Sequence, residues 1–401
     1  NQLDGFLSVQ PIAALEVGDV FEIELGPTFR LRLIDLPPVQ HGFDYGGILR
    51  RPDWDETSDF GQIVQLLRIG SENTPASLFV GATRKKTLGL GHLISRYSNI
   101  ENTDYHPAAA TGILAVGPIR VEAFASDVLG ARIFAGDIRW DIGATFSQNA
   151  DWRDRLMLAF EAAHDAAIAG RPIQYDPLVT RTPVPSATLF HTDFSAVVLR
   201  SEHVRLMLLA GAGVRANADA DLGFVVGGMA DVTAGRIGVS AKAELRKQAG
   251  RFRQGFFGPS YELSRFADIG LGPAPIANAS LPDSFSAYGE LRVGVGEHGH
   301  IDLAIEHFFT NRTDFDVTAS LNLVDRRLAA FGRLTGVGIG QSDRFSAAAG
   351  LRVRAIAALY AFGSVGLLYI PQPDLRLVPG LTGTLGVGVD LIGVGVSLLG
   401  V

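Results

Sequence analysis

The sequence contains no cysteine among its 401 residues, which excludes disulfide bonds and thiolate metal sites. It also lacks any run of about 18 consecutive apolar residues, the length that a transmembrane helix requires. The nearest approach lies between Val387 and Val401, where glycines, Asp390 and Ser397 interrupt the apolar residues. Membrane-spanning helices are therefore excluded as well.

Charged residues are also scarce, since Asp, Glu, Lys and Arg make up 19% of the chain, against roughly a quarter in soluble domains. Hydrophobic residues nevertheless reach 47%, and the mean hydropathy is +0.21. Because only helices and closed β-barrels satisfy the backbone inside lipid, a barrel is the remaining membrane architecture. The net charge of −7 argues against a nucleic-acid partner.

Hydrophobic and polar residues alternate most clearly in the C-terminal half. Apolar side chains occupy one face and charged or polar side chains the other between Arg236 and Arg246, and the same period of two recurs at 289–295, 301–305, 315–323, 345–355 and 381–389. This period over about ten residues is typical of membrane barrel strands, which are apolar toward lipid and polar toward the lumen. A soluble β-sandwich also alternates, but its strands are usually only about 5–6 residues long.

The N-terminal half is less regular. We expect a hairpin in which 21–25 and 29–33 pair around Gly26-Pro27, so that Glu22 and Glu24 face Arg30 and Arg32. Further strands are predicted at 62–69, 77–84, 111–116, 119–125 and 131–146. The fold class is therefore an all-β, transmembrane, antiparallel up-and-down β-barrel of about 16–20 strands, with 18 the best guess because single-chain bacterial barrels have an even number.

One segment departs from this alternation. Between Asp151 and Gly170 apolar residues recur at spacings of three and four, Asp151 is a candidate N-cap, and Gly170-Arg171-Pro172 ends the pattern. The sequence predicts a short helix here. With the proline-rich stretch that follows, it forms a helix-containing excursion over 151–190, outside the barrel wall or folded into its mouth.

With these strands the chain resembles the porin-like outer-membrane β-barrel proteins of bacteria, in pattern and over most of its length. The resemblance implies a single barrel domain over 1–401 in the bacterial outer membrane, in contact with lipid and lipopolysaccharide. Such barrels often form homo-oligomers. No export leader precedes Asn1, so any signal peptide is expected to have been removed. The chain lacks the family's usual terminal aromatic residue, and candidates for the interfacial aromatic girdles are Phe256, Phe257, Tyr261, Phe266, Phe308, Phe309, Tyr360, Phe362 and Tyr369.

Charged residues on the expected lumen face are the candidate functional residues, because charged rings bias which solutes enter a water-filled pore. If the lumen is selective, an anion-attracting patch is expected around Arg246, Arg251 and Arg253. Because charges of both signs are interspersed and not segregated, pairing across strands is the better explanation of them. The pore-lining candidates are Arg236, Lys242, Glu244, Arg246, Arg251, Arg253, Glu290, Arg292, Asp302, Glu306, Asp316, Arg352, Arg354 and Asp390.

Two other places contain residue types that catalysis or metal binding would need. The polar segment 89–107 contains His92 and Ser98, as a barrel lipid hydrolase would need, but six strand residues span about 20 Å, too far for a hydrogen bond. A structured loop or lumen constriction is the better interpretation, and no enzyme activity is expected. His298 and His300 flank a turn glycine, a pair that nine histidines produce by chance. No metal or cofactor is expected.

The functional prediction is an outer-membrane channel for passive diffusion of small polar or charged solutes. A barrel of about 16–18 strands leaves an aqueous bore, whereas eight strands leave none. The alternative is a non-transporting scaffold or anchor that binds partners of a cell-envelope complex. The excursion at 151–190 motivates this alternative, because it would plug the bore or dock a partner.

Overall fold

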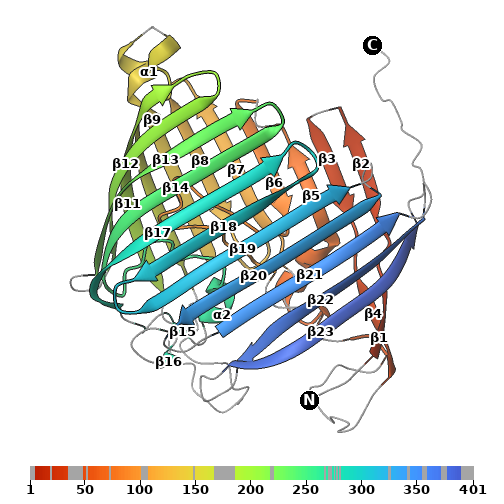
Figure 1. Cartoon of the computed structure of the whole chain (residues 1–401). Helices are drawn as coiled ribbons and strands as arrows, with labels where there is room; N and C mark the ends of the chain where they lie inside the picture. The colour runs from red at the N-terminus through yellow and green to blue at the C-terminus, as the bar shows by residue number, and fades with distance from the viewer. Residues whose placement is uncertain are drawn as a thin grey trace, which may run out of the picture.

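Backbone pairing follows the order of the chain, with each wall strand hydrogen-bonded antiparallel to the next (Figure 1). The computed structural model describes residues 5–18, 20–34, 48–50, 53–71, 74–100, 107–147, 150–166, 186–216, 221–265, 268–269, 273–274, 276, 279, 281–323, 327–340, 344–354, 359–371 and 377–389. Within them, ladders run without interruption from β2 to β23, and no ladder joins β23 back to β2. The sheet curls into an up-and-down β-barrel wall.

The wall contains 19 strands in the described residues, within the predicted range of 16–20 and one more than the best guess. They are β2 (Ala13–Val17), β3 (Phe21–Leu25), β5 (Val64–Ile69), β6 (Ala76–Gly81), β7 (Ala109–Val116), β8 (Ile119–Ala125), β9 (Ile133–Asp141), β10 (Leu156–Asp165), β11 (Ala187–Arg200), β12 (Val204–Arg215), β13 (Leu222–Ala234), β14 (Ile237–Gly250), β17 (Leu281–Val295), β18 (Gly299–Phe308), β19 (Arg312–Leu323), β20 (Leu328–Ile339), β21 (Arg344–Arg354), β22 (Leu359–Pro371) and β23 (Leu377–Val389).

The remaining elements are short. β1 (Gly5–Val9) pairs with β4 (Phe29–Ile34), and β15 (Asp268–Ile269) pairs with β16 (Pro273–Ala274). The helices are α1 (Ile142–Phe146), α2 (Tyr261–Ser264) and two 3-10 turns at Thr57–Ile63 and Ala150–Trp152. No helix within the described residues has the length and apolar character needed to cross a bilayer.

The two faces of the wall have the opposite polarity to those of a soluble protein. On β11, Phe190 and Phe194 point outward with 47% and 44% of their surface exposed, whereas His191 and Asp193 between them are 2% and 1% exposed. On β23, the outward Leu385 is 90% exposed. An apolar exterior around a polar, buried interior is the arrangement of a barrel whose outer surface contacts acyl chains.

The predicted hairpin between 21–25 and 29–33 is wrong. β3 lies between β2 and β5, and β4 pairs with β1. Glu22 therefore faces Arg68 on β5, with Arg68 Nη2 2.7 Å from its carboxylate. The cross-strand pairing of opposite charges is retained, but with a different strand.

The helix predicted from Asp151 to Gly170 is also wrong. β10 occupies 156–165 and pairs residue by residue with β9 and β11, so the excursion predicted over 151–190 is partly wall; residues 167–185 lie outside the described part of the chain. Glu161 and Ala163 point inward while Phe160 points outward, 53% exposed. An alanine-rich sequence fits both the helical and the strand period. Pairing with β9 and β11 selects the strand.

Candidate functional site

A loop enters the barrel after β6. Residues 82–100, here called the inner loop, close into a small hairpin in which Lys86 and Tyr97 exchange backbone hydrogen bonds of 2.8 Å each. Leu88, Leu93 and Ile94 are fully buried. The predicted lumen constriction in the polar segment 89–107 thus agrees with the described residues of that segment.

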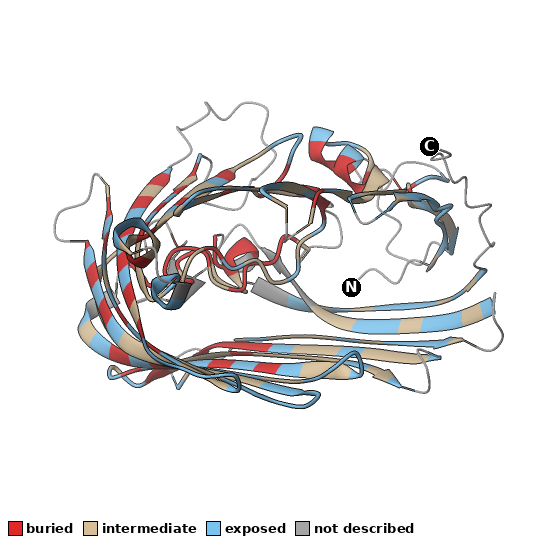
Figure 2. Ribbon diagram, turned by 90° about the horizontal axis from the view of Figure 1, so that it is seen from above, coloured by how far each residue is buried: buried red, intermediate tan, exposed pale blue. Residues whose placement is uncertain are grey.

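A second piece of chain lies against this loop. In residues 251–265, here called the inner segment, Phe257 accepts a hydrogen bond from Ser95 N at 3.1 Å and donates to Leu93 O at 3.0 Å. Gly255 N donates to His92 O at 2.7 Å. Seen from above, segments rich in buried residues lie inside the wall (Figure 2). The two pieces form one unit in the lumen.

An apolar core holds this unit together inside a polar barrel. Its fully or almost fully buried members come from the inner loop, the inner segment and inward-facing positions of the wall: Leu88, Leu93, Ile94, Tyr97, Phe124, Ile133, Leu189, Phe252, Phe256, Phe257 and Tyr261. Phe256, Phe257 and Tyr261 were expected in the aromatic girdles, and that expectation is wrong. They pack against one another, with Phe257 and Tyr261 ring centroids 4.8 Å apart.

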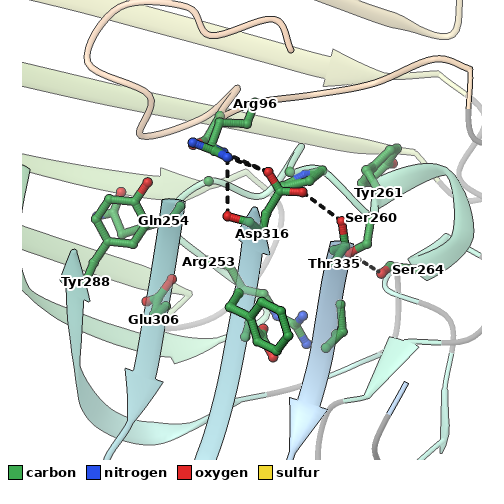
Figure 3. Close-up of a pocket in the computed structure, with 18 of the residues that line it drawn as sticks. Arg96, Arg253, Gln254, Ser260, Tyr261, Ser264, Tyr288, Glu306, Asp316 and Thr335 are labelled. Carbon is green, nitrogen blue, oxygen red and sulfur yellow. Dashed lines mark hydrogen bonds and ion pairs between the residues drawn. The ribbon is translucent and has the colours of Figure 1, made fainter. Parts of the chain in front are cut away.

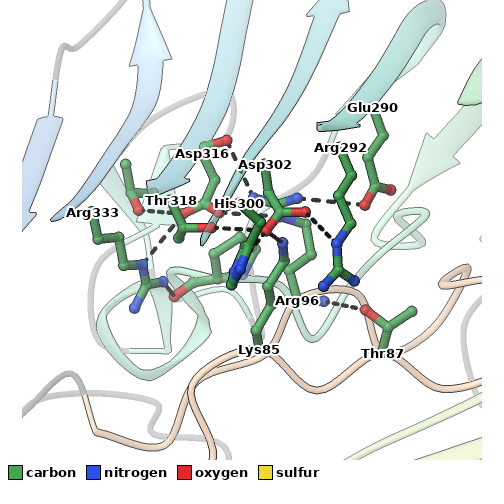
Figure 4. Close-up of polar contacts among 12 residues, drawn as sticks. Lys85, Thr87, Arg96, Glu290, Arg292, His300, Asp302, Asp316, Thr318 and Arg333 are labelled. Carbon is green, nitrogen blue, oxygen red and sulfur yellow. Dashed lines mark hydrogen bonds and ion pairs between the residues drawn. The ribbon is translucent and has the colours of Figure 1, made fainter. Parts of the chain in front are cut away.

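Ionic contacts tie the inner loop to widely separated strands. Figure 4 shows those that Lys85 and Arg96 make with the strands β17, β18 and β19. Lys85 Nζ lies 2.6 Å from Asp302 on β18, and Lys86 pairs with Glu122 on β8. The described wall therefore holds the loop from two sides. Burial and the nearby Arg96 cation lower the pKa of Lys85, although Asp302 opposes this shift.

Arg96 makes the most extensive of these contacts. Its guanidinium lies 2.5 Å from Asp316 on β19 and 3.4 Å from Glu290 on β17, and its backbone has a φ of +56°. Burial works against the charged form, but Asp316 and Glu290 outweigh it and raise the pKa of Arg96. A left-handed backbone at a non-glycine residue costs about 1–3 kcal/mol and persists where its surroundings enforce it.

Glu262 on α2 joins the inner segment to the inner loop and the wall. Its carboxylate accepts a hydrogen bond of 2.6 Å from the Tyr97 hydroxyl and pairs with Arg132 at 3.0 Å and Arg265 at 3.3 Å. Burial favours the neutral acid, but Arg132 and Arg265 prevail and lower the pKa of Glu262. The carboxylate is therefore kept ionised inside the protein.

A cavity of about 120 Å³ lies between this unit and strands β17–β20 (Figure 3). Its lining combines arginines, carboxylates and aromatic rings, including Arg96, Arg246, Arg253, Tyr261, Tyr288, Glu306, Arg312, Asp314 and Asp316. Arg246 stacks over the Tyr288 ring at 3.7 Å and pairs with Glu306 at 2.9 Å. The cavity can hold a few waters or a small polar group beside fixed charges.

The predicted pore-lining residues occupy several environments. Eight lie on the inward face of β14 and β17–β19: Lys242, Glu244, Arg246, Glu290, Arg292, Asp302, Glu306 and Asp316. Arg251 and Arg253 belong to the inner segment; Arg253 lines the cavity, and Arg251 pairs with Asp221 at 3.2 Å. Arg352 and Arg354 share the inward face of β21, Arg236 is exposed in the β13–β14 turn, and Asp390 lies outside the described residues.

Sequence reasoning missed the inward residues Glu161 on β10 and His191 and Asp193 on β11. Both ring nitrogens of His92 reach carboxylates of the wall, at 2.7 Å to Asp193 and 3.0 Å to Glu244, and neither bonds Ser98. His92, His191 and Asp193 form the group with metal-ligating geometry in the described residues. A histidine and an aspartate two apart on a strand share a face, and this signal was available in the sequence.

No family model and no curated protein matches this chain. Solved structures of outer-membrane β-barrels from Pseudomonas aeruginosa are similar to it at low identity. A mutant of the ferric enterobactin receptor PfeA, in complex with enterobactin, has a TM-score of 0.40 at 10% identity, over 97% of this chain and 74% of that one. OccK8 (OprE) gives 0.36 at 9%, over 96% and 97%, and OpdK with vanillate gives 0.35 at 10%, over 81% and 91%. These likenesses concern the fold alone.

Proposed function

We propose that this protein is a bacterial outer-membrane barrel through which small polar or charged solutes diffuse, in a lumen narrowed by the inner loop. The observation that carries the proposal is the reversed polarity of the wall, with Phe190 outside and Asp193 inside on one strand. Such a wall is stable where its exterior contacts lipid and lipopolysaccharide and its interior contacts water and charged groups.

The proposed route runs beside the inner loop, along β21–β23. Inward side chains there are exposed, among them Arg352 on β21, Ser364 on β22 and Thr384 on β23. Inward side chains on the opposite sector, such as Asp193 and Glu244, are 1% and 5% exposed because the inner loop covers them. Solutes would therefore meet the arginines of β21, which favours anions.

Conductance in planar bilayers tests this proposal. Purified protein is expected to give discrete channels with a preference for anions, and Arg352→Glu together with Arg354→Glu is expected to reduce or reverse that preference. Arg236→Glu is the matched control, since this arginine is exposed in the β13–β14 turn. Protein that inserts without conducting, or identical selectivity in all three proteins, would contradict the proposal.

The second candidate is a non-transporting envelope scaffold. The fully buried Leu93, Ile94 and Phe257 favour it, because they fill one sector of the lumen with a packed core. A scaffold would stay silent in bilayers even when the inner loop is released by Arg96→Met, and it would copurify with envelope proteins in mild detergent. A channel would instead conduct more strongly after that release.

A further inference from the structure

Two histidines and an aspartate meet where the inner loop touches β11. The ligating atoms of His92, His191 and Asp193 all lie within 4.8 Å of one another, and all three side chains are buried. His92 Nδ1 is 2.7 Å from Asp193 Oδ1, and His191 Nδ1 is 3.1 Å from Asp193 Oδ2. The two imidazole centroids are 4.7 Å apart. One carboxylate thus has an imidazole against each of its oxygens.

The contacts of this cluster are incomplete without an added cation. Both ring nitrogens of His92 contact carboxylate oxygens, Nδ1 to Asp193 and Nε2 to Glu244 at 3.0 Å. A neutral imidazole carries only one N–H, so the second contact needs an added proton or a metal ion. In the described residues Nε2 of His191 has no hydrogen-bond partner, and Nδ1 has only its 3.1 Å contact with Asp193 Oδ2, which lacks hydrogen-bond geometry, although the side chain is 0% exposed. Buried polar atoms of this kind normally have a partner.

The charges around the cluster also indicate a missing cation. Neither Asp193 nor Glu161 has a lysine or arginine within ion-pair distance in the described chain. Glu161 faces His191 directly across the β10–β11 ladder, and its Oε2 is buried without a hydrogen bond. Glu244, by contrast, is neutralised by Lys242 and Arg246. A divalent cation would offset the charge of Asp193, which no lysine or arginine of the described chain approaches.

The neighbouring strand leaves room for the two β11 side chains. Gly211 and Gly213 on β12 stand directly opposite Asp193 and His191. A Cβ on Gly211 would lie 2.3 Å from Asp193 Oδ1, and one on Gly213 would lie 2.5 Å from His191 Cδ2. Only glycine at these two positions allows the imidazole and carboxylate to lie over the sheet.

We propose that His92, His191 and Asp193 bind one divalent transition-metal ion, which fastens the inner loop to β11. Two imidazole nitrogens and a carboxylate oxygen are a ligand set that Zn²⁺ accepts, with Co²⁺, Ni²⁺ and Cu²⁺ as chemical relatives. Calcium and magnesium are disfavoured, because they prefer sites made of oxygen alone. This site is separate from the proposed solute route along β21–β23.

Cobalt titration of the purified, chelator-treated barrel in detergent tests the proposal. We expect one Co²⁺ per chain, with visible d–d absorption bands of a nitrogen- and oxygen-ligated ion that Zn²⁺ abolishes by displacement. X-ray absorption at the zinc edge should report two imidazoles. His191→Gln and His92→Gln should each weaken binding by at least about tenfold, the scale expected for damage to a metal site.

His307→Gln is the matched control, because this imidazole is exposed and, among the described residues, hydrogen-bonds Thr313 alone at 2.9 Å. Its affinity should equal that of the unaltered protein. Circular dichroism and heat-dependent gel mobility establish that each variant is folded before titration. Absence of a cobalt spectrum in the folded protein, or retention of full affinity in the folded His92→Gln, His191→Gln double variant, would overturn the proposal. Loss of binding in His298→Gln instead would also overturn it.

Discussion

Arg96 and Asp316 lie 220 positions apart in the sequence and meet inside the barrel, where the Nη2 atom of Arg96 is 2.5 Å from Oδ2 of Asp316. Nε lies 3.1 Å from the same oxygen, and Nη2 also donates to the backbone carbonyl of Asp316 at 3.3 Å. One side chain thus connects the inner loop to β19 through three contacts. Charge-assisted contacts of this kind are strong and directional.

Arg96→Met is expected to loosen the inner loop and to destabilise the barrel by about 3 kcal/mol, at the low end of the cost of breaking a buried ion pair. The low end applies because Arg333 and Thr335 still contact Asp316, at 3.3 and 2.7 Å. Urea unfolding in lipid vesicles measures this loss. Arg352→Met, on an exposed inward arginine, should change stability little, and equal losses in both variants would contradict the account.

Gly213→Ala should destabilise the protein by about 1–3 kcal/mol, the usual cost of overpacking. A Cβ at this position would come within 2.3 Å of Phe252 in the inner segment and 2.5 Å of His191. The inner segment must move to admit it. Gly238→Ala is the matched control, because nothing lies within 4 Å of the added carbon. Thermal unfolding midpoints of the two variants measure the cost of the added carbon. Equal midpoints would show that the close approach of Gly213 to Phe252 and His191 does not affect stability.

Leu385→Arg places a charge on the outward face of β23, where the leucine is 90% exposed. If this face contacts acyl chains, the change should cost about 2–4 kcal/mol near the middle of the bilayer and less near its edges. Thr384→Arg, one residue earlier and on the inward face, should cost far less. Equal effects of the two variants on unfolding in vesicles would mean that the apolar face does not contact lipid.

Acid should loosen the inner segment through Glu262. Its folded-state pKa lies below the ordinary value of 4.5, because Arg132 and Arg265 outweigh the effect of burial. A group whose pKa is lower in the folded state contributes stability above its unfolded value and loses it as the pH falls through the folded value. Stability should therefore decline below about pH 4.5, and this decline should be smaller in Glu262→Gln.

The control for that pH profile is Glu202→Gln, since Glu202 is exposed between β11 and β12. Its profile should match that of the unaltered protein. Protease accessibility of the inner segment, followed from pH 7 downward, gives a second reading. Parallel profiles for all three proteins would show that other carboxylates govern the acid response.

The architecture was predictable because alternation is a local property. The strands expected in the C-terminal half occur as β14, β17, β18, β19, β21 and β23. The segment at Asp151 was misjudged because alanine spacing suits both a helix and a strand, and only the ladders to β9 and β11 decide between them. Glu22 meets Arg68 and not Arg30 or Arg32 of the expected hairpin, because strand order places β5 beside β3.

The interior was harder to predict, because it depends on contacts between distant parts of the chain. Polar residues around His92 indicated a structured loop, yet nothing local showed that the loop would bind Asp193 and Glu244, which lie 101 and 152 positions away. The sequence places Phe257 in an interfacial girdle equally well, because an exposed girdle and a buried core both select aromatic rings. Packing of the inner loop against Phe257 shows that this ring belongs to the buried core.

The inner loop makes ionic contacts with strands that lie far apart in the sequence, so these contacts form only after those strands have joined the sheet. Glu122 on β8 lies 36 positions after its partner Lys86, whereas Asp302 and Asp316 belong to strands much later in the sequence. The loop can complete its anchoring only after β18 and β19 have joined the sheet. A chain blocked before β18 and β19 pair would lack Asp302 and Asp316, and the inner loop would then keep only its contact with Glu122 among these three anchors.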